Sequence, residues 1–412
     1  MTDLMSVQEA QERILSAFST LSSEKVTLEN CLYRVLAEPI FSDMNLPPFS
    51  NSSMDGFAVI ASDLKNSTPE NPTTLKVIQN ISAGANHLFE IKNGQASRIM
   101  TGAPLPPGAD SVIPIEFTSL AQEFSAQTTP DFVKFFASVE SGENIRPQGM
   151  DIKAGEPVFP ARQEILPKDI GILAALGIKE VTCTKMPKIA ILSTGDELLE
   201  FSEDIQPGKI RDTNRPTLKA MALSQGVAVI DLGIVPDDPT RIREKFDQAI
   251  AEKVDLIITS AGVSMGAFDY VREVIKNAGK LNFWKVNIRP GKPLSFGEYK
   301  GTPTIGLPGN PVSAFIGFTV FVLPVIYHLK GLQNLDRHAG TAILENDVTS
   351  DGRESYLRGK VYFKDTNNFA RLTRHQGSGN LLSLADSNAL LIIPSGVKSL
   401  PTGSEVVFWP LT

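Results

Sequence analysis

Three apolar runs in the middle of the chain each end in a tight, polar loop that contains glycine. The runs are 188–192, 254–259 and 304–307, and the loops after them are 193–197, 260–266 and 307–311. These runs lack the alternation of half-exposed strands, which is typical of strands buried on both faces of a parallel sheet. Because ligands bind beyond the carboxyl ends of such strands, the loops predict one binding crevice.

Length and charge limit the class of protein. A chain of 412 residues exceeds the size of one hydrophobic core, so we expect several domains. The net charge of −7 argues against a general nucleic-acid-binding protein. The two cysteines, Cys31 and Cys183, lie far apart in the sequence, so we expect neither a disulfide framework nor a zinc site.

Two segments bear on membranes and targeting. The first residues, with Val7, Ala10 and Ile14 at helical spacing, predict an amphipathic helix rather than a signal peptide. The apolar stretch 312–329 is about as long as a bilayer span. It directly follows a buried strand and contains polar residues, so we expect a core or subunit-interface helix. The sequence therefore predicts a cytoplasmic protein.

The pattern changes along the chain predict four domains. Residues 50–151 carry short β-type runs broken by glycine and proline, which indicate a small inserted β domain. The flanking pieces, 1–49 and 152–185, are each too small for a core, so we expect them to pack together as a discontinuous domain with a second helix ending near Pro39. Strands and helices alternate over 186–331, which predicts a doubly wound α/β domain. We expect helices to stop there and 332–412 to form a β domain.

The crevice loops carry residues suited to phosphate and metal. The run Thr194, Gly195, Asp196 and Glu197 either caps a helix or places a carboxylate where it can hold Mg²⁺. The next loop offers small side chains, hydroxyls and backbone N–H groups that suit a phosphate, namely Ser260, Gly262, Ser264 and Gly266. Asp269 either points into the same crevice or caps a helix.

Positive charge gathers before the third loop. Lys285 and Arg289 are four residues apart, which on one strand places both on the same face, and Lys292 follows closely. The three cations either converge on an oxyanion or form a solvated edge. Dense polar turns at 51–58 and 100–106 indicate either plain turns or a recognition surface in the inserted β domain.

The ordered set of motifs resembles the molybdopterin molybdenumtransferases of the MoeA family, also seen as the E domain of gephyrin. The matching segments run in order over nearly the whole chain: Ser-Met-Asp-Gly-Phe (53–57), Thr-Gly-Ala-Pro-Leu-Pro (101–106), Asn-Ile-Arg and Gly-Met-Asp-Ile (within 144–152), Ser-Thr-Gly-Asp-Glu-Leu (193–198), Asp-Thr-Asn (212–214), Gly-Val-Ser-Met-Gly with Asp-Tyr (within 262–270), Pro-Gly-Lys-Pro (290–293), Leu-Pro-Gly-Asn-Pro-Val-Ser (307–313) and His-Gln-Gly-Ser (375–378).

The resemblance implies a four-domain homodimer that transfers molybdenum from molybdate to adenylylated molybdopterin with Mg²⁺ and releases AMP. It implies an active site between the α/β domain of one subunit and the small β domain of the other. The candidate catalytic residues are Asp55, Thr101, Arg146, Asp151, Glu197, Asp237 or Asp238, Asp269, Lys285, Arg289, Lys292 and Ser378. The cofactor-binding set adds Thr194, Gly195, Asp196, Ser260, Gly262, Ser264, Gly266, Pro308, Gly309, Asn310 and Pro311.

Within these sets the resemblance assigns ligands more finely. Glu197 and Asp269 would hold Mg²⁺, and Ser378, with Arg353 or Arg358 less securely, would hold molybdate. The molybdopterin adenylyltransferase is the candidate protein partner, and we expect no nucleic acid or membrane. A tungsten-preferring insertase and a non-catalytic molybdopterin-binding scaffold are the alternatives.

Three positions depart from the family pattern. Arg289 stands where the family usually has lysine, which turns a point charge into a planar fork. Ala261 stands for a glycine and adds a methyl group where a positive φ is expected. Ala267 and Phe268 occupy positions where an acidic residue is often found. We expect these changes to tune activity rather than abolish it.

Overall fold

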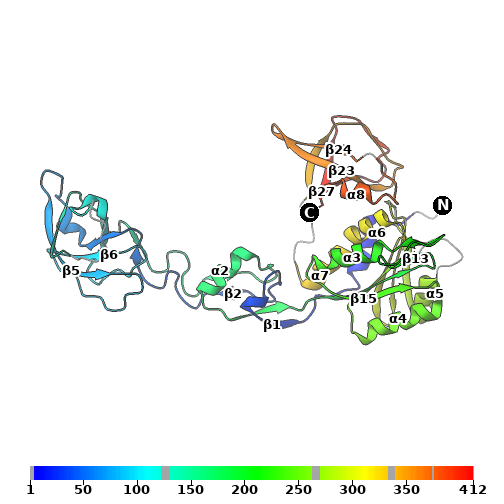
Figure 1. Ribbon diagram of the computed structural model, residues 1–412, viewed down its shortest axis with the longest axis horizontal. Helices are drawn as coiled ribbons and strands as arrows, with labels where there is room; N and C mark the ends of the chain where they lie inside the picture. Colours follow the sequence, from blue (N-terminus) through cyan, green and yellow to red (C-terminus); the bar gives the residue numbers. More distant parts are fainter. Residues whose placement is uncertain (1–3, 122–129, 262–269, 333–338, 374, 412) are drawn as a thin grey trace. The chain divides into compact units, whose positions relative to one another are not determined.

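The chain folds into two compact units. The structure, a computed structural model, describes residues 4–121, 130–261, 270–332, 339–373 and 375–411 (Figure 1). Unit 1 comprises Met1–Glu38, Arg162–Leu166 and Glu180–Thr412, and unit 2 comprises Pro39–Ala161 and Pro167–Lys179. The chain therefore leaves unit 1 twice and returns to it twice.

Unit 2 is built on a five-stranded sheet with the strand order β7-β4-β6-β5-β8. The strands are β4 (Gly56–Val59), β5 (Thr73–Ile81), β6 (Gln95–Ile99), β7 (Ser111–Pro114) and β8 (Phe132–Phe135). Phe57 and Phe135 pack edge to face in the core with ring centroids 5.5 Å apart. Two smaller pairs also belong to unit 2, β2 (Ile40–Phe41) with β10 (Pro157–Phe159) and β3 (Asn51–Ser52) with β9 (Ile145–Arg146), as does helix α2 (Pro167–Ala175). The predicted small β fold is confirmed.

Unit 1 contains a six-stranded sheet with the order β15-β12-β16-β20-β19-β17. The first four strands are parallel: β12 (Lys188–Thr194), β15 (Ala228–Val235), β16 (Leu256–Ser260) and β20 (Thr302–Leu307). Antiparallel strands β19 (Pro293–Tyr299) and β17 (Gly279–Lys285) extend one edge. This is the doubly wound α/β arrangement that the alternating pattern predicts.

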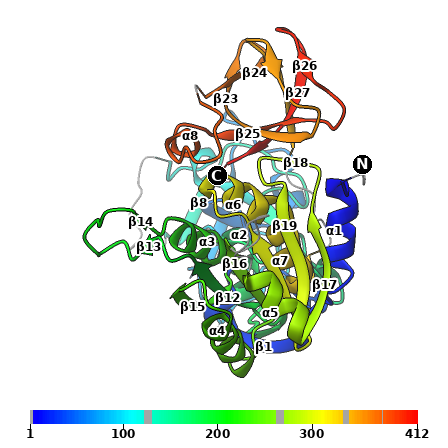
Figure 2. The ribbon, with the colours of Figure 1, turned by 90° about the vertical axis from the view of Figure 1, so that its right-hand side faces the viewer.

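Helices cover both faces of this sheet, because alternate strand residues point to opposite sides (Figure 2). On one face Ile191 and Ile258 pack against α1 (Val7–Leu15), α3 (Asn214–Leu223) and the apolar helix that follows β20. On the other face Leu192 and Ile257 pack against α4 (Pro239–Ala251) and α5 (Tyr270–Ala278). The strands are buried on both sides, which explains their continuous apolar character.

The apolar helix after β20 is a core helix. It runs from Pro311 to Lys330 as α6 (Pro311–Gly317), a π-helical turn η4 (Phe318–Val322) and α7 (Leu323–Lys330). By length and composition it is the one helix in the described part of the chain that is long and apolar enough to cross a membrane, and 72% of its apolar window is buried inside the protein. The burial agrees with the expected core helix.

The C-terminal strands close into a barrel. They are β21 (Gly340–Leu344), β23 (Glu354–Lys364), β24 (Asn367–Leu372), β25 (Ala389–Ile393) and β27 (Glu405–Pro410), and β23 pairs with both β24 and β25. The short β18 (Ile288–Arg289) pairs with β23, and β22 (Val348–Thr349) pairs with β26 (Ser399–Leu400). The expectation of no further helix is wrong, because Leu382–Ala385 form the short helix α8.

The predicted second helix near the N-terminus is also wrong. Residues Ser23–Thr27 form β1, which pairs with β11 (Glu180–Thr184), and only the single 3₁₀ turn Leu28–Asn30 follows. Tyr33 has a left-handed φ of 60°, and Leu36 forms a β-bridge with Cys183. Pairing with distant strands therefore outweighs the local helical spacing.

Candidate functional site

The three loops singled out in the sequence leave from adjacent strands. In the sheet register Ser193 of β12 lies beside Ser260 of β16, which in turn lies beside Leu307 of β20. The backbone N–H of Ala261 donates to the carbonyl oxygen of Leu307 at 3.1 Å, just beyond the strand ends. The chain order reverses between β12 and β16, which is where ligands bind in such sheets. The predicted adjacency of the three strands that carry these loops is therefore confirmed.

The segment after β12 carries a group of acids rather than a helix cap. Residues Leu198–Leu199 form β13, so the helix-cap interpretation of Asp196 and Glu197 is wrong. The Glu197 carboxylate folds over Gly195, where a Cβ would collide with it. The backbone N–H of Asp237, which follows β15, donates to Asp196 Oδ1 at 3.2 Å. Burial, together with the nearby charges of Asp196 and Glu197, raises the pKa of Asp237.

Of the two acids after β15, Asp237 faces this group and Asp238 does not. Asp238 is the N-cap of α4, and its Oδ1 accepts a hydrogen bond from the backbone N–H of Arg241 at 2.9 Å. Pro239 follows at the first helical turn. Asp238 therefore has a local structural role.

The strand ends also present hydroxyls with unused hydrogen-bonding capacity. Ser193, Thr194 and Thr259 are buried, and within the described ranges their side-chain oxygens have no hydrogen-bond partner. Buried polar atoms normally have partners, so unpartnered hydroxyls at the ends of these strands suit a bound polar ligand. The expected ligands Gly262, Ser264, Gly266 and Asp269 lie outside the described residues.

The acids fit magnesium only in combination with a substrate. Among the residues that the structure describes, no three His, Cys, Asp or Glu side chains surround a common metal position. Mg²⁺ usually keeps several waters and uses one or two carboxylates together with substrate phosphates. Glu197 with Asp237 or Asp196 could provide such a partial set.

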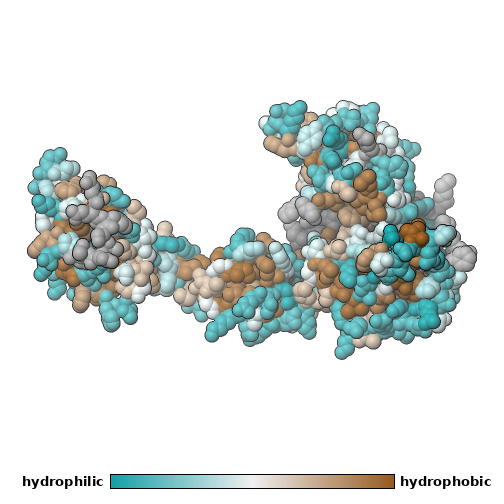
Figure 3. Space-filling model, in the orientation of Figure 1, coloured by the Kyte–Doolittle hydropathy of each residue, from teal (hydrophilic) through white to brown (hydrophobic). Residues whose placement is uncertain are grey.

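A pair of very short strands follows these acids, and the sequence did not predict it. Strand β13 (Leu198–Leu199) pairs in parallel with β14 (Ile210–Arg211), and Ile210 N–H donates to the Glu197 carbonyl oxygen at 2.8 Å. The side chains of Phe201, Ile205 and Ile210 are exposed, and a small hydrophobic area lies close to β13 in Figure 3. Each of these strands has only two residues, which is too short to show the alternating pattern that predicts a strand.

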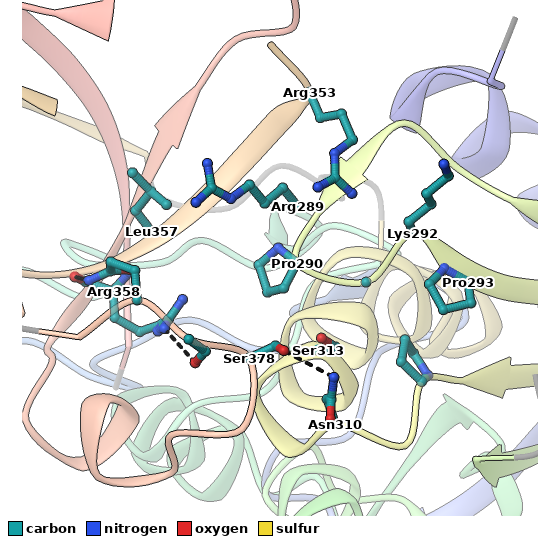
Figure 4. Close-up of a pocket in the computed structure, with 14 residues that line it drawn as sticks. Arg289, Pro290, Lys292, Pro293, Asn310, Ser313, Arg353, Leu357, Arg358 and Ser378 are labelled. Carbon is teal, nitrogen blue, oxygen red and sulfur yellow. Dashed lines mark hydrogen bonds between the residues drawn. The ribbon is translucent and has the colours of Figure 1, made fainter. Parts of the chain in front are cut away.

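A cationic pocket lies between the loop after β18, the start of α6 and strand β23 of the barrel (Figure 4). Its cavity volume is about 390 Å³. Among the described residues, four cations and no carboxylate line it: Arg289, Lys292, Arg353 and Arg358. The other lining residues are Pro290, Gly291, Pro293, Pro308, Asn310, Ser313, Leu357, Gln376, Gly377 and Ser378. This composition suits an anion.

Arg358 is the most deeply buried of these cations. It is 0% exposed; its Nε donates to Ser383 Oγ at 3.1 Å and its Nη2 to the Gly377 carbonyl oxygen at 3.0 Å. Nη1 has no partner in the part of the chain that the structure describes. Burial, and then the charge of Arg289, lowers the Arg358 pKa to about 10, so the side chain stays charged near neutral pH. A buried charge with a free N–H favours an anionic ligand.

Arg353 differs because its charge is already neutralised. Its Nε donates to Asp351 Oδ2 at 3.0 Å, and Nη1 donates to the Ile288 carbonyl oxygen at 3.0 Å. The charge and hydrogen bonds of Arg353 lower the pKa of Asp351. Arg353 thereby ties β18 to the barrel and supports the position of Arg289.

The expectation that Lys285 and Arg289 share one strand face is wrong. β17 ends at Lys285, and Arg289 belongs to β18, which pairs with β23 of the barrel rather than with the six-stranded sheet. The change of sheet between them breaks the two-residue period. Lys285 does not line the pocket, whereas Arg289 and Lys292 do.

The residues predicted in the N-terminal half meet in two pairs within unit 2. Asp55 Oδ1 accepts hydrogen bonds from the backbone N–H of Thr101 at 2.7 Å and from its hydroxyl at 2.8 Å. Arg146 forms an ion pair with Asp151. Because β3 pairs with β9, these turns belong to one polar surface of unit 2.

The chain matches known families and proteins over its whole length. Residues 5–177 match the MoeA N-terminal region (domain I and II), residues 190–328 a probable molybdopterin binding domain, and residues 341–411 the MoeA C-terminal region (domain IV). Two curated relatives named molybdopterin molybdenumtransferase are those of Nostoc sp., 36% identical over 98% of this chain and 94% of the relative, and of Haemophilus influenzae, 35% identical over 99% and 98%. The crystal structure of a molybdopterin biosynthesis moeA protein from Pyrococcus horikoshii is 31% identical, with a TM-score of 0.83 over 99% of this chain and 100% of that one.

Proposed function

The chain belongs to the MoeA family, and from that premise we propose that it is a molybdopterin molybdenumtransferase that acts on adenylylated molybdopterin and molybdate. In this reaction molybdenum enters the dithiolene-bearing pterin, the pyrophosphate bond is cleaved and AMP is released. The observation that carries the proposal is the cationic pocket, which has no carboxylate among the described residues of its lining and a buried, unpartnered Nη1 on Arg358.

The pocket chemistry suits a tetrahedral dianion such as molybdate. Arg358 offers a buried charge and a free N–H, while Arg289 and Lys292 add charge from the opposite wall (Figure 4). The Ser378 hydroxyl accepts from Asn310 Nδ2 at 3.0 Å, which leaves its own proton available to an oxyanion. Charge-assisted hydrogen bonds of this kind are the strong ones.

The strand-end crevice suits the phosphates of the second substrate. Pyrophosphate cleavage depends mainly on positioning and charge neutralisation, so it needs no nucleophilic side chain. The hydroxyls of Ser193, Thr194 and Thr259 would donate to phosphate oxygens, and Glu197 with Asp237 would hold Mg²⁺ against them. Bound Mg²⁺ would neutralise the charge that develops on the leaving phosphate.

The proposal includes a cytoplasmic homodimer of four-domain subunits with shared active sites. The two residue pairs of unit 2, Asp55 with Thr101 and Arg146 with Asp151, would complete the crevice of a second copy. Mixing an Asp55→Ala protein with a Glu197→Ala protein tests this arrangement. Each mixed dimer would have one intact site, so equal mixing should restore roughly a quarter of wild-type activity. Failure to recover activity after confirmed subunit exchange would contradict shared sites.

Release of AMP from adenylylated molybdopterin in the presence of Mg²⁺ and molybdate tests the function itself. We expect turnover by the wild-type chain and a loss on the order of 100-fold or more in Glu197→Ala. Glu252→Ala is the matched control, since Glu252 pairs with Lys188 at the surface. Binding of molybdopterin without AMP release would instead indicate a scaffold, and preferential use of tungstate in competition would indicate a tungsten insertase.

A further inference from the structure

Asn214 joins two of the crevice loops through one side-chain amide. It is the first residue of α3 and is 8% exposed. Its Nδ2 donates two hydrogen bonds of 2.7 Å, one to Ser260 Oγ and one to the Gly309 carbonyl oxygen. Asn214 is part of the Asp-Thr-Asn motif (212–214), and the reaction described above assigns it no role.

In the described part of the chain, few other contacts join these two loops. Ser260 ends β16 and Gly309 follows β20, and beyond the paired strands the backbone bond from Ala261 to Leu307 joins them. A Cβ on Gly309 would lie 3.3 Å from the Ala261 Cβ, so the loops already approach closely there. The Asn214 amide adds a second connection, between Ser260 at the end of β16 and Gly309, two residues beyond Leu307.

Asn214 is itself held from the helix side. Asp212 Oδ1 accepts from the backbone N–H groups of Asn214 at 3.0 Å and Arg215 at 3.2 Å. Asp212 is buried, and its own N–H donates to the Leu199 carbonyl oxygen at 2.8 Å. Arg215 forms ion pairs with Asp212 and with Asp231 of β15. The position of the amide is therefore set by the start of α3 and not by the loops that it joins.

We propose that Asn214 is a positioning residue, which fixes the Ser260 and Gly309 loops at the separation that the substrate phosphates require. This inference rests on the proposed function. The two hydrogens of one amide nitrogen serve both acceptors, so both contacts depend on a single group. Asn214→Asp keeps the shape but turns an oxygen toward the Gly309 carbonyl, which separates the loops by repulsion.

Single-turnover kinetics of the full chain test the proposal, with enzyme in excess over adenylylated molybdopterin. A misplacement near 1 Å costs on the order of 100-fold in rate, so we expect a fall of that order in Asn214→Asp and about tenfold in Asn214→Ala. The matched control is Asn368→Asp, which loses a comparable bond from Nδ2 to the Thr341 carbonyl oxygen in the barrel. The control should keep the wild-type rate constant.

The first-order rate constant separates positioning from a structural role. A structural role would lower the melting temperature and the reaction amplitude while the rate constant of the folded fraction stays unchanged, and that result would overturn the proposal. A binding defect is checked with Asn214→Ala at saturating enzyme concentration: a rate constant that remains low supports positioning, whereas one that returns to the wild-type value contradicts it.

Amide hydrogen exchange at Ala261 tests, without any turnover, whether the Asn214 amide holds the two loops together. We expect the Ala261 N–H, bonded to Leu307, to exchange faster in Asn214→Asp than in the wild type and to stay unchanged in Asn368→Asp. If the wild-type chain releases no AMP, the proposed function fails, but this measurement still tests whether Asn214 holds the two loops together. Unchanged exchange at Ala261 would refute the inference independently of the reaction.

Discussion

The Nδ2 of Asn310 donates a hydrogen bond of 3.0 Å to the Oγ of Ser378. Beside it, the backbone N–H of Val312 donates to the Ser378 carbonyl oxygen, also at 3.0 Å. These bonds join the loop after β20, which leads into the crevice, to the barrel loop that carries Ser378. One connecting segment therefore borders both the cationic pocket and the strand ends. A change at Ser378 should weaken the binding of molybdate more than the binding of the pterin substrate.

Ser378→Ala should raise the molybdate concentration needed for half-maximal AMP release by about tenfold, the equivalent of one net hydrogen bond to a charged group. The half-saturating concentration of adenylylated molybdopterin should change less. Ser387→Ala is the control, because Ser387 Oγ donates within its own turn to the Leu384 carbonyl oxygen at 2.8 Å. Equal effects on both substrates would argue against a specific molybdate contact.

Arg358→Lys should weaken molybdate binding, measured by calorimetric titration, although it retains a positive charge. A lysine cannot bond Ser383, Gly377 and an anion at once, so we expect a loss of about tenfold to 100-fold. Because the wild-type pKa is about 10, the Arg358 charge should persist and its contribution to affinity should be flat between about pH 7 and pH 9.

Arg353→Lys is the matched control for that substitution. Arg353 lines the same pocket but already forms an ion pair with Asp351. We therefore expect Arg353→Lys to lose less affinity for molybdate than Arg358→Lys. A loss as large as that of Arg358→Lys would show that total positive charge, and not the unpartnered guanidinium, determines binding.

The adjacency of the three strand ends was predictable from the sequence because these strands are buried on both faces. Continuous apolar runs ending in glycine loops mark such strands, and their carboxyl ends meet at one edge whatever the details of the loops. The contacts that define the pocket were not predictable by pattern. Arg289 belongs to a different sheet from the nearby β17, and Arg358 lies in the pocket through barrel pairings with no local period. Ser378 lies in a loop that is bonded to Asn310 and Val312. Likewise Asp196 and Glu197 look like a helix cap until the short β13 follows.

Arg215→Met should destabilise unit 1 by roughly 3–5 kcal/mol, because it leaves a buried ion-pair network without its cation. The Arg215 side chain is 10% exposed and pairs with Glu200, Asp212 and Asp231. Urea unfolding followed by tryptophan fluorescence measures this, since both tryptophans belong to unit 1. Arg241→Met, which breaks an exposed pair with Glu244, should cost less than about 1 kcal/mol.

The contribution of Arg215 to the free energy of unfolding should also depend on pH. Although burial alone would raise it, the pKa of Asp231 is lowered by hydrogen bonds from Arg215, Lys219 and Gly233. A carboxylate with a depressed folded pKa stabilises the protein above its unfolded pKa of about 3.9 and loses that contribution as the pH falls through the lower folded value. The stability gap between wild type and Arg215→Met should therefore be full at neutral pH and shrink below about pH 4. A gap that is constant with pH would contradict the role of Asp231.

Ala261 and Gly309 should show coupled effects on stability. Ala261 has a φ of 72°, which confirms the expected left-handed conformation at a position where the family carries glycine. Such a conformation costs alanine about 1–2 kcal/mol, which the flexibility of glycine in the unfolded chain partly offsets, so Ala261→Gly should stabilise by roughly 0–1 kcal/mol. Gly309→Ala alone should destabilise by about 1 kcal/mol, because the new Cβ would lie 3.3 Å from the Ala261 Cβ.

In the double mutant that contact disappears, since a glycine in place of Ala261 presents no methyl group to the Cβ introduced at position 309. The cost of Gly309→Ala should therefore be smaller by roughly 0.5–1 kcal/mol in the Ala261→Gly background than in the wild type. A double-mutant cycle of urea midpoints, converted with a common slope, measures the coupling. Strict additivity would show that the two loops do not touch at this point. The same four proteins assayed for AMP release would then reveal whether the close approach of the loops, rather than the tie through Asn214, limits the reaction.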